Sequence, residues 1–291
     1  MARSSFILAC IIYLFNSIGN VSQGIFIKYF QQTNGINMYH LITLKCIVIS
    51  IVLLPFILKN LKCFFNKLHI VILLATLYAS DMIFYNNGLK GISANTATII
   101  LLMVPLWIIV FGRFILKEHK FNKVNAVCIF ICLLAIFSTL FGEIKIEGFN
   151  NGYIYVFIDS LIIPLSLILQ KKFNDCRPVL YAIWTNAIVL GVISFLMSGL
   201  TLPEFNKENV FSGFVVAFFD IMECGAVYIA YQMTEVALLQ PIRFTRLPIA
   251  MVMSLFLLNE KPTYIQVSAG LVIINMNLFS MWYSRKYQSN K

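Results

Sequence analysis

The fold is decided by two stretches of equal length, DMIFYNNGLKGISANTATIILLMVPLWIIVFGRFILKE at residues 81–118 and ECGAVYIAYQMTEVALLQPIRFTRLPIAMVMSLFLLNE at residues 223–260. A shift of 142 residues sets Asp81 against Glu223 and Glu118 against Glu260. Each copy is an apolar span with one acid, a short turn, and a second apolar span that closes on a Glu. A weak internal repeat of this kind within a hydrophobic chain is typical of membrane transporters.

The composition around these stretches predicts an integral membrane protein. Of the 291 residues, 60% are hydrophobic and 12% are charged, whereas a soluble domain carries about 25% charged residues. A net charge of +10 could suggest a nucleic-acid partner. Such an apolar chain leaves no soluble domain for a basic surface, so we expect no nucleic acid and assign the positive charges to membrane topology.

Apolar runs near the length of about 20 residues that crosses a bilayer recur along the whole chain. They predict an all-α fold of ten transmembrane helices, at residues 6–28, 39–58, 69–88, 93–116, 123–141, 152–170, 178–199, 209–231, 236–258 and 263–283. The first run is too long for a cleaved signal peptide and has no small-residue cleavage site.

The distribution of Lys and Arg predicts the orientation. With the N-terminus in the cytoplasm, the cytoplasmic segments hold 13 of these residues and the outer loops hold four, so both termini are predicted to be cytoplasmic. Five spans per half is an odd number, which requires the second half to be inserted upside down. We therefore expect residues 1–146 and 147–291 to be two inverted five-helix repeats, with a binding site near the midplane.

Seven ionisable side chains lie deep within the predicted spans. At about 3 kcal/mol each on insertion scales, seven isolated charges would cost about 20 kcal/mol, more than a typical net stability of about 5–15 kcal/mol. They must therefore be paired, neutralised or hydrated. These residues are Lys45, Asp81, Asp159, Asp220, Glu223, Arg243 and Arg246.

Six of the seven have an opposite charge at equal height in a neighbouring helix, because two antiparallel helices rise at the same rate per residue. Glu223 lies level with Arg243, and Asp220 with Arg246. Lys45 likewise lies level with Asp81. Two interpretations stand for these groups: they form structural ion pairs between helices, or Asp81, Glu223 and Arg243 bind substrate.

Asp159 has no such partner in its own hairpins. An acid of this kind either faces water or holds a proton, which makes Asp159 our first candidate for a proton-coupling or cation-binding carboxylate. The alternative is an ion pair with a basic group from a more distant helix, such as Arg243.

Helix 1 carries an amide stripe, Asn16, Asn20 and Gln23, at helical spacing. The stripe either lines the transport cavity or hydrogen-bonds to a neighbouring helix. Pro241 and Pro248 bracket Arg243 and Arg246 in helix 9, and Pro105 lies at almost the equivalent place in helix 4. Irregular helices at equivalent places in two halves point to a transport site.

Other chemistry finds little support. The seven Cys and three His form no cluster at metal-ligand spacing, so no metal or cofactor is expected. A membrane enzyme would need clustered catalytic residues at a membrane face, and His40, His69 and His119 lie near three different span ends. We therefore expect no catalytic residue.

Several short motifs resemble the EamA-type drug/metabolite transporter superfamily. They are Lys28-Tyr29-Phe30 after helix 1, Thr96-Ala97-Thr98 at the start of helix 4, Pro105 thirteen residues before Glu118, and Gln240-Pro241-Ile242-Arg243-Phe244 in helix 9. Within it, Lys45, the run Ile-Val-Leu-Leu-Pro at 51–55 and Arg243 are most similar to the S-adenosylmethionine uptake transporters of obligate intracellular bacteria.

This resemblance implies a secondary transporter of the bacterial inner membrane that takes up a small polar metabolite, S-adenosylmethionine or an amino acid, by alternating access. It implies the lipid bilayer as surroundings, proton coupling as the energy source, and a monomer. An exporter of amino acids or other metabolites is the alternative. The residues expected at the substrate are Asp159, Arg243 and the helix 1 stripe, followed by Asp81 and Glu223.

Overall fold

The protein was analysed as a computed structural model, which describes residues 3–58, 68–115, 123–147, 149–173, 179–234 and 236–289. The described part contains helices and no strand. The helices are α1 (Arg3–Asn34), α2 (Met38–Leu58), α4 (Leu68–Gly91), α5 (Ala94–Leu101), α6 (Val104–Ile115), α7 (Lys123–Glu147), α8 (Gly152–Lys172), α9 (Val179–Met197), α10 (Lys207–Met233), α11 (Val236–Arg243), α12 (Arg246–Leu257) and α13 (Tyr264–Ser289).

Eight helical segments of the described residues are long and apolar enough to cross a membrane. Two further apolar helices, Ala126–Gly142 and Tyr264–Ser280, are shorter and coincide with the fifth and tenth predicted spans. The prediction of a multi-pass, all-helical membrane protein is confirmed. Ten complete spans remain a prediction.

The fourth and ninth predicted spans are both broken in the middle. α5 and α11 have eight residues each, and α6 and α12 have twelve each. In the second half, α11 and α12 each begin and end 142 residues after their counterparts in the first half, α5 and α6. Pro105 and Pro248 occupy the first turns of α6 and α12, where the missing N–H removes no helical hydrogen bond.

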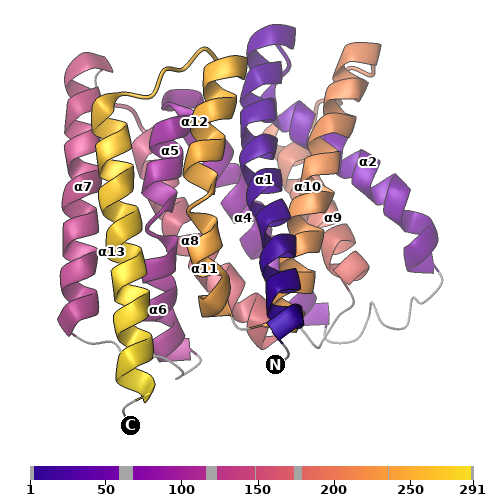
Figure 1. The fold of residues 1–291 in the computed structure, drawn as a ribbon. Coiled ribbons are helices and arrows are strands. Elements are labelled where there is room, and N and C mark those ends of the chain that lie inside the picture. Colours follow the sequence, from indigo (N-terminus) through magenta and orange to yellow (C-terminus); the bar gives the residue numbers. More distant parts are fainter. Residues whose placement is uncertain are drawn as a thin grey trace.

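The most extensive contacts join helices that are far apart in the sequence (Figure 1). α1 lies against α10, α2 against α9, α4 against α8, and α7 against α13. Both termini lie at the same end of the bundle (Figure 1). Helices from the first half are thus interleaved with helices from the second, and side chains from both halves meet in the interior.

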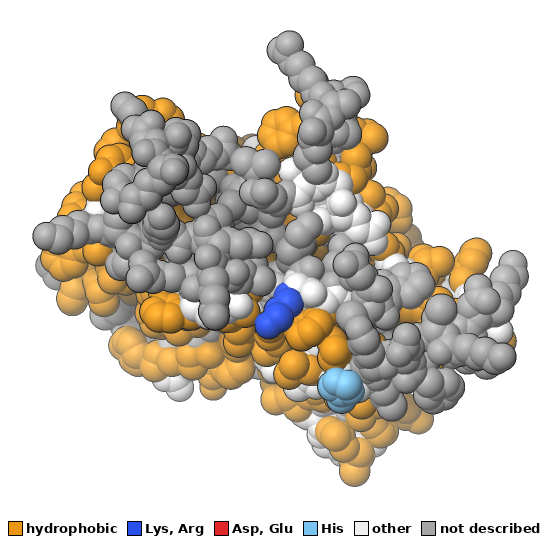
Figure 2. All heavy atoms as spheres, turned by 90° about the horizontal axis from the view of Figure 1, so that it is seen from below, with side chains coloured by type: hydrophobic (Ala, Val, Ile, Leu, Met, Phe, Trp, Pro, Cys, Tyr) orange, Lys and Arg blue, Asp and Glu red, His pale blue; other side chains and the backbone are white. Residues whose placement is uncertain are grey.

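The outer surface is apolar, as the bilayer requires. Side chains such as Phe130, Phe218 and Phe256 are more than half exposed. Seen from the end that carries the termini, the coloured side chains are mostly hydrophobic, and no Asp or Glu is visible among them (Figure 2). The charged residues of the spans face inward instead.

Gly19 allows α1 and α10 to approach closely. A Cβ added to Gly19 would lie 2.8 Å from the carbonyl oxygen of Phe219 and 2.9 Å from the amide nitrogen of Glu223. Small residues at such crossings let membrane helices pack backbone against backbone. This contact brings the amide stripe of α1 directly against the acids of α10.

Candidate substrate cavity

Helices from both halves of the chain enclose a polar cavity of about 500 Å³, counting the space open to solvent. Five of the seven side chains predicted to bind substrate line it, while Gln23 and Asp159 lie behind the wall. The charged and amide side chains of the lining are Asn16, Asn20, Asp81, Gln170, Asn186, Glu223, Arg243 and Arg246.

The amide stripe of α1 holds Glu223. Asn20 Nδ2 donates to Glu223 Oε1 at 2.6 Å, and Asn16 Nδ2 donates to the Glu223 backbone carbonyl at 3.0 Å. With its amide oriented to satisfy both neighbours, Gln23 donates to Glu223 Oε2 at 2.8 Å and accepts from Lys45. Both interpretations of the stripe therefore apply, because Asn16 and Asn20 bind the neighbouring helix and also face the cavity.

Arg246 is held by the opposite ends of the same two amides. Its terminal nitrogens donate to Asn20 Oδ1 at 2.7 Å and to Asn16 Oδ1 at 2.9 Å. Each Asn thus accepts from an arginine of α12 and donates to Glu223 of α10. α1 forms a polar bridge between two helices that each carry a buried charge.

Lys45 forms the one ion pair found deep inside the described part of the bundle. Its Nζ lies 2.9 Å from Asp220 Oδ2, and the side chains are 0% and 4% exposed. Tyr78 donates its hydroxyl hydrogen to the other oxygen of Asp220, and Cys224 Sγ lies 3.6 Å from the same oxygen. These three partners around the carboxylate of Asp220 offset the cost of burying its charge. This arrangement is typical of a structural residue.

The ion pairs expected from equal heights have other partners. Lys45 contacts Asp220 rather than Asp81, because α2 packs against α9 and α10. Arg246 contacts amides rather than Asp220, because α12 packs on α1 and not directly on α10. Equal height did not identify the partners, because the pairs α2 with α4 and α10 with α12 are not among the closely packed helices.

Glu223 and Arg243, also expected to pair, form no ion pair in the structure. Glu223 is instead surrounded by the amides of α1. The helix between them explains the difference, since α1 lies against both α10 and the broken pair α11 and α12.

Asp159 meets another acid, Asp81. Its side chain is fully buried and interacts with the carboxyl group of Asp81, while neither of its oxygens has a hydrogen-bond partner among the described residues. Asp81 is half-buried and lines the cavity. Two ionised carboxyl groups that interact in an apolar interior repel each other, which favours a proton on one of them, so the pair can hold a proton next to the cavity.

Arg243 lies at the end of α11, where the helix breaks. It is 4% exposed and forms neither a hydrogen bond nor an ion pair within the described chain. It borders the main cavity and a second, smaller one on the side of Tyr85 and Pro105. The nearby carboxyl groups of Asp81 and Asp159 offset its charge, while its donors are available to a ligand.

Sequence reasoning missed two cavity residues, Gln170 and Asn186. Gln170, in the last turn of α8, looked like an interfacial residue at a span end. Asn186 lies within the apolar span of α9, where a lone amide was the available signal.

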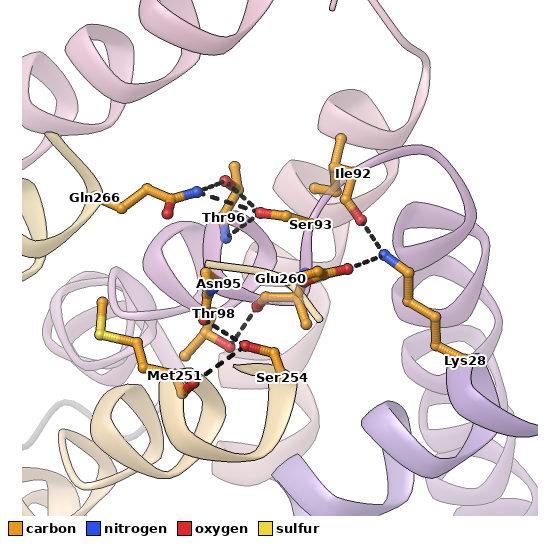
Figure 3. Close-up of polar contacts among 11 residues, drawn as sticks. Lys28, Ile92, Ser93, Asn95, Thr96, Thr98, Met251, Ser254, Glu260 and Gln266 are labelled. Atoms are coloured by element: carbon orange, nitrogen blue, oxygen red, sulfur yellow. Dashed lines mark hydrogen bonds and ion pairs between the residues drawn. The ribbon is translucent and has the colours of Figure 1, made fainter. Parts of the chain in front are cut away.

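The end of the bundle opposite the termini is closed by polar contacts (Figure 3). Lys28 Nζ lies 2.7 Å from Glu260 Oε1 and donates to the Ile92 carbonyl at 2.8 Å. Glu260 Oε2 accepts from the Ala94 amide at 2.8 Å, at the first residue of α5. Ser254 donates to Asn95 Oδ1 at 3.0 Å. Glu260 is the last residue of the second repeated stretch, residues 223–260. It thus caps α5, the helix with which the fourth span begins in the first half.

No group of three or more His, Cys, Asp or Glu that could hold a metal ion occurs among the described residues. The cavity instead combines a cation, carboxyl groups and amides in an enclosed polar space. This arrangement can bind a small molecule that carries both signs of charge.

Comparison with known proteins confirms the resemblance to EamA-type transporters. Residues 7–141 match the EamA-like transporter family. Proteins named S-adenosylmethionine uptake transporter are similar over most of the chain. Those of Rickettsia conorii and Rickettsia prowazekii are each 26% identical over 255 residues, covering 83% of this chain and 82% of the relative. That of Rickettsia bellii is 26% identical over 253 residues, covering 83% of both.

One solved crystal structure shares the fold, with a TM-score of 0.65 at 14% identity over 98% of this chain and 99% of the other. The matched family and the named relatives are transporters rather than enzymes.

Proposed function

We propose that this chain is a secondary-active transporter of the bacterial inner membrane that takes up S-adenosylmethionine. The observation that carries the proposal is the cavity, where Arg243 has no hydrogen bond or ion pair within the described residues and Asp81 lies close by. A guanidinium binds a carboxylate through two parallel hydrogen bonds, and carboxylates attract ammonium and sulfonium groups. S-adenosylmethionine carries all three charges, and the named relatives support it as substrate.

The two halves, residues 1–146 and 147–291, are proposed to be inverted repeats that rock about the cavity. Two observations support this. The broken spans share one offset of 142 residues, and the packing repeats when each helix is replaced by the one five spans later. Thus α1 lies on α10 as α8 lies on α4, and α4 lies on α9 as α10 lies on α2. Since one chain supplies both halves, we expect a monomer to suffice.

The arrangement corresponds to one state of alternating access. The cavity reaches the last turns of α8, toward the end that carries the termini, while Lys28 and Glu260 close the opposite end. With the termini in the cytoplasm, as the Lys and Arg distribution predicts, this is an inward-facing state. Opening to the outside then requires Glu260 to leave Lys28 and the first turn of α5.

Proton coupling is assigned to the carboxyl pair of Asp81 and Asp159. Asp81 lines the cavity, whereas Asp159 is buried next to Asp81 and does not line it. A proton can therefore pass from the cavity to Asp81 and on to Asp159 without entering the apolar interior as a free ion. The charged groups around this pair are Lys45, Glu223, Arg243 and Arg246.

Uptake of radiolabelled S-adenosylmethionine into bacterial cells that express the protein tests the proposal. We expect accumulation above the empty-vector control that falls at least tenfold in Arg243→Ala. Lys172→Ala, a change at an exposed position in the last turn of α8, serves as the control and should transport normally. Wild-type cells that accumulate no more than the empty vector would contradict uptake. Faster loss of preloaded substrate from such cells would indicate export instead.

A further inference from the structure

Gln170 and Asn186 line the cavity, but their amides are not hydrogen-bonded to its charged groups. Gln170 is 9% exposed and Asn186 is 2% exposed. Gln170 Oε1 and Asn186 Oδ1 are buried without a hydrogen-bond partner, and no side-chain hydrogen bond of either residue occurs within the described chain. Burying an unpaired amide is unfavourable, so two of them in one cavity wall point to a missing ligand.

The two amides approach the cavity from α8 and α9, apart from the arginines of α11 and α12. Gln170 lies in the last turn of α8, whereas Asn186 lies two turns into α9. The remaining wall near them is largely apolar, with Ile163, Leu167 and Val227 among the lining residues. This part of the cavity therefore suits a flat, uncharged ring whose edge carries hydrogen-bonding groups.

An amide side chain has an acceptor oxygen beside two donor hydrogens. Its complement is an edge with a donor next to an acceptor. The N7 edge of adenine has this pattern, since its exocyclic amino group donates and ring nitrogen N7 accepts, and Asn and Gln are the side chains that read it in proteins. In the deaminated base both atoms of this edge are acceptors. The apolar wall can cover the ring faces.

We infer that Gln170 and Asn186 recognise the aminopurine end of the substrate, while Arg243 and Asp81 bind its charged amino-acid end. The inference rests on the proposed function and extends it to a specificity determinant. It predicts that the carrier reads the exocyclic amino group and rejects a base in which this donor has become an acceptor.

The test compares S-adenosylmethionine with its deaminated counterpart, S-inosylmethionine, as unlabelled competitors of labelled S-adenosylmethionine uptake. For the wild type, the deaminated compound should need at least a tenfold higher concentration for half-inhibition. Asn186→Leu and Gln170→Leu should each reduce this ratio to threefold or less, because they weaken the binding of S-adenosylmethionine. Leu has nearly the size of each amide and offers no hydrogen bond.

Ser194→Ala is the matched control. Ser194 lies on α9 like Asn186, is fully buried, and has an unpartnered hydroxyl, yet it does not line the cavity. This variant should keep the wild-type ratio. Fluorescence-detected size exclusion of each variant confirms that the protein is folded, and uptake of S-methylmethionine, which has the charged end without the base, should be unchanged in all three.

The outcomes separate the two ideas. A wild type that takes up S-adenosylmethionine but is inhibited equally by both compounds contradicts the aminopurine site and leaves the proposed function intact. The same holds if the Leu variants keep the wild-type ratio. A wild type that takes up no S-adenosylmethionine overturns the proposed function, and the inference with it.

Discussion

At the residue scale, the interior of this transporter depends on amides that separate charges. Asn16 and Asn20 each bind Glu223 on one side and Arg246 on the other, so these two charged residues are bridged by amides rather than paired directly. Asn20 contacts both charged groups, whereas Asn16 contacts the guanidinium of Arg246 and the backbone carbonyl of Glu223. The one direct pair in this region, Lys45 with Asp220, lies outside the cavity lining.

Removing one member of that pair should destabilise the fold. Lys45→Met leaves Asp220 buried without its cation, and breaking a buried pair in this way costs about 3–5 kcal/mol. We expect a clearly lower thermal midpoint in detergent, measured by fluorescence-detected size exclusion. The double variant Lys45→Met with Asp220→Leu should recover most of the loss, because no isolated charge remains. Equal midpoints for the single variant and the wild type would show that the pair is not structural.

Asp159→Asn should uncouple transport from protons. The variant keeps the size of the side chain and can still hydrogen-bond to Asp81, but it no longer shares an acid proton with it. We expect exchange of labelled for unlabelled substrate to continue at a rate within about threefold of the wild type, while accumulation sensitive to a protonophore is lost. Accumulation that stays protonophore-sensitive in the variant would remove Asp159 from the coupling.

At the scale of elements, the sequence predicted where helices lie along the chain better than which helices pack against each other. Apolar runs placed the helices to within a few residues, and Pro105 and Pro248 lie directly after the breaks in the fourth and ninth spans. The partners of Lys45 and Arg246 were wrong because equal height along a hairpin says nothing of which helix lies beside it. That choice depends on the fold as a whole, here on the position of α1 between α10 and α12.

Gly19→Ala should disturb the contact of α1 with α10. The added methyl group would lie within 2.9 Å of two backbone atoms of α10, which cannot rotate away as a side chain could. We expect a lower thermal midpoint and reduced uptake. Gly225→Ala is the control, since its Cβ would meet no atom closer than 3.9 Å. There the gain in helix propensity should leave the midpoint unchanged or slightly raised. A Gly19→Ala variant that matches this control would contradict the close contact.

Glu260→Gln should loosen the closed end of the bundle. The change keeps the size of the side chain but removes the charge that binds Lys28 and the first turn of α5. We expect faster amide hydrogen exchange in peptides that cover residues 92–96, read by mass spectrometry, while peptides of α9 remain as in the wild type. Unchanged exchange at residues 92–96 would mean that this contact does not hold the end closed.

At the scale of the whole molecule, the placement of both termini at one end agrees with an even number of spans (Figure 1). The Lys and Arg distribution then predicts that this end is cytoplasmic. A C-terminal fusion of green fluorescent protein should be fluorescent, and a C-terminal alkaline phosphatase fusion should be inactive. An active phosphatase fusion together with a non-fluorescent protein fusion would show that the C-terminus lies outside the cytoplasm. The orientation would then be opposite to the proposed one, and the structure would represent an outward-facing state.

The cavity itself could be predicted from the sequence only in part. The acids, arginines and helix 1 amides were identifiable because ionisable or repeated polar residues in apolar spans are costly. Gln170 and Asn186 were not, since single uncharged amides are frequent in membrane helices and become informative only when their lack of a partner is known. The contact of Asp81 with Asp159 also needed the structure, because it joins helices of different halves.

The most direct test of the central claim is counterflow in proteoliposomes. Purified protein is reconstituted with millimolar unlabelled S-adenosylmethionine inside and a trace of the labelled compound outside, with Arg243→Ala as the inactive reference. A carrier for S-adenosylmethionine should give a transient accumulation of label that is at least tenfold larger for the wild type and requires the unlabelled compound inside. Label that enters no faster than in Arg243→Ala or protein-free liposomes would contradict a carrier for this substrate.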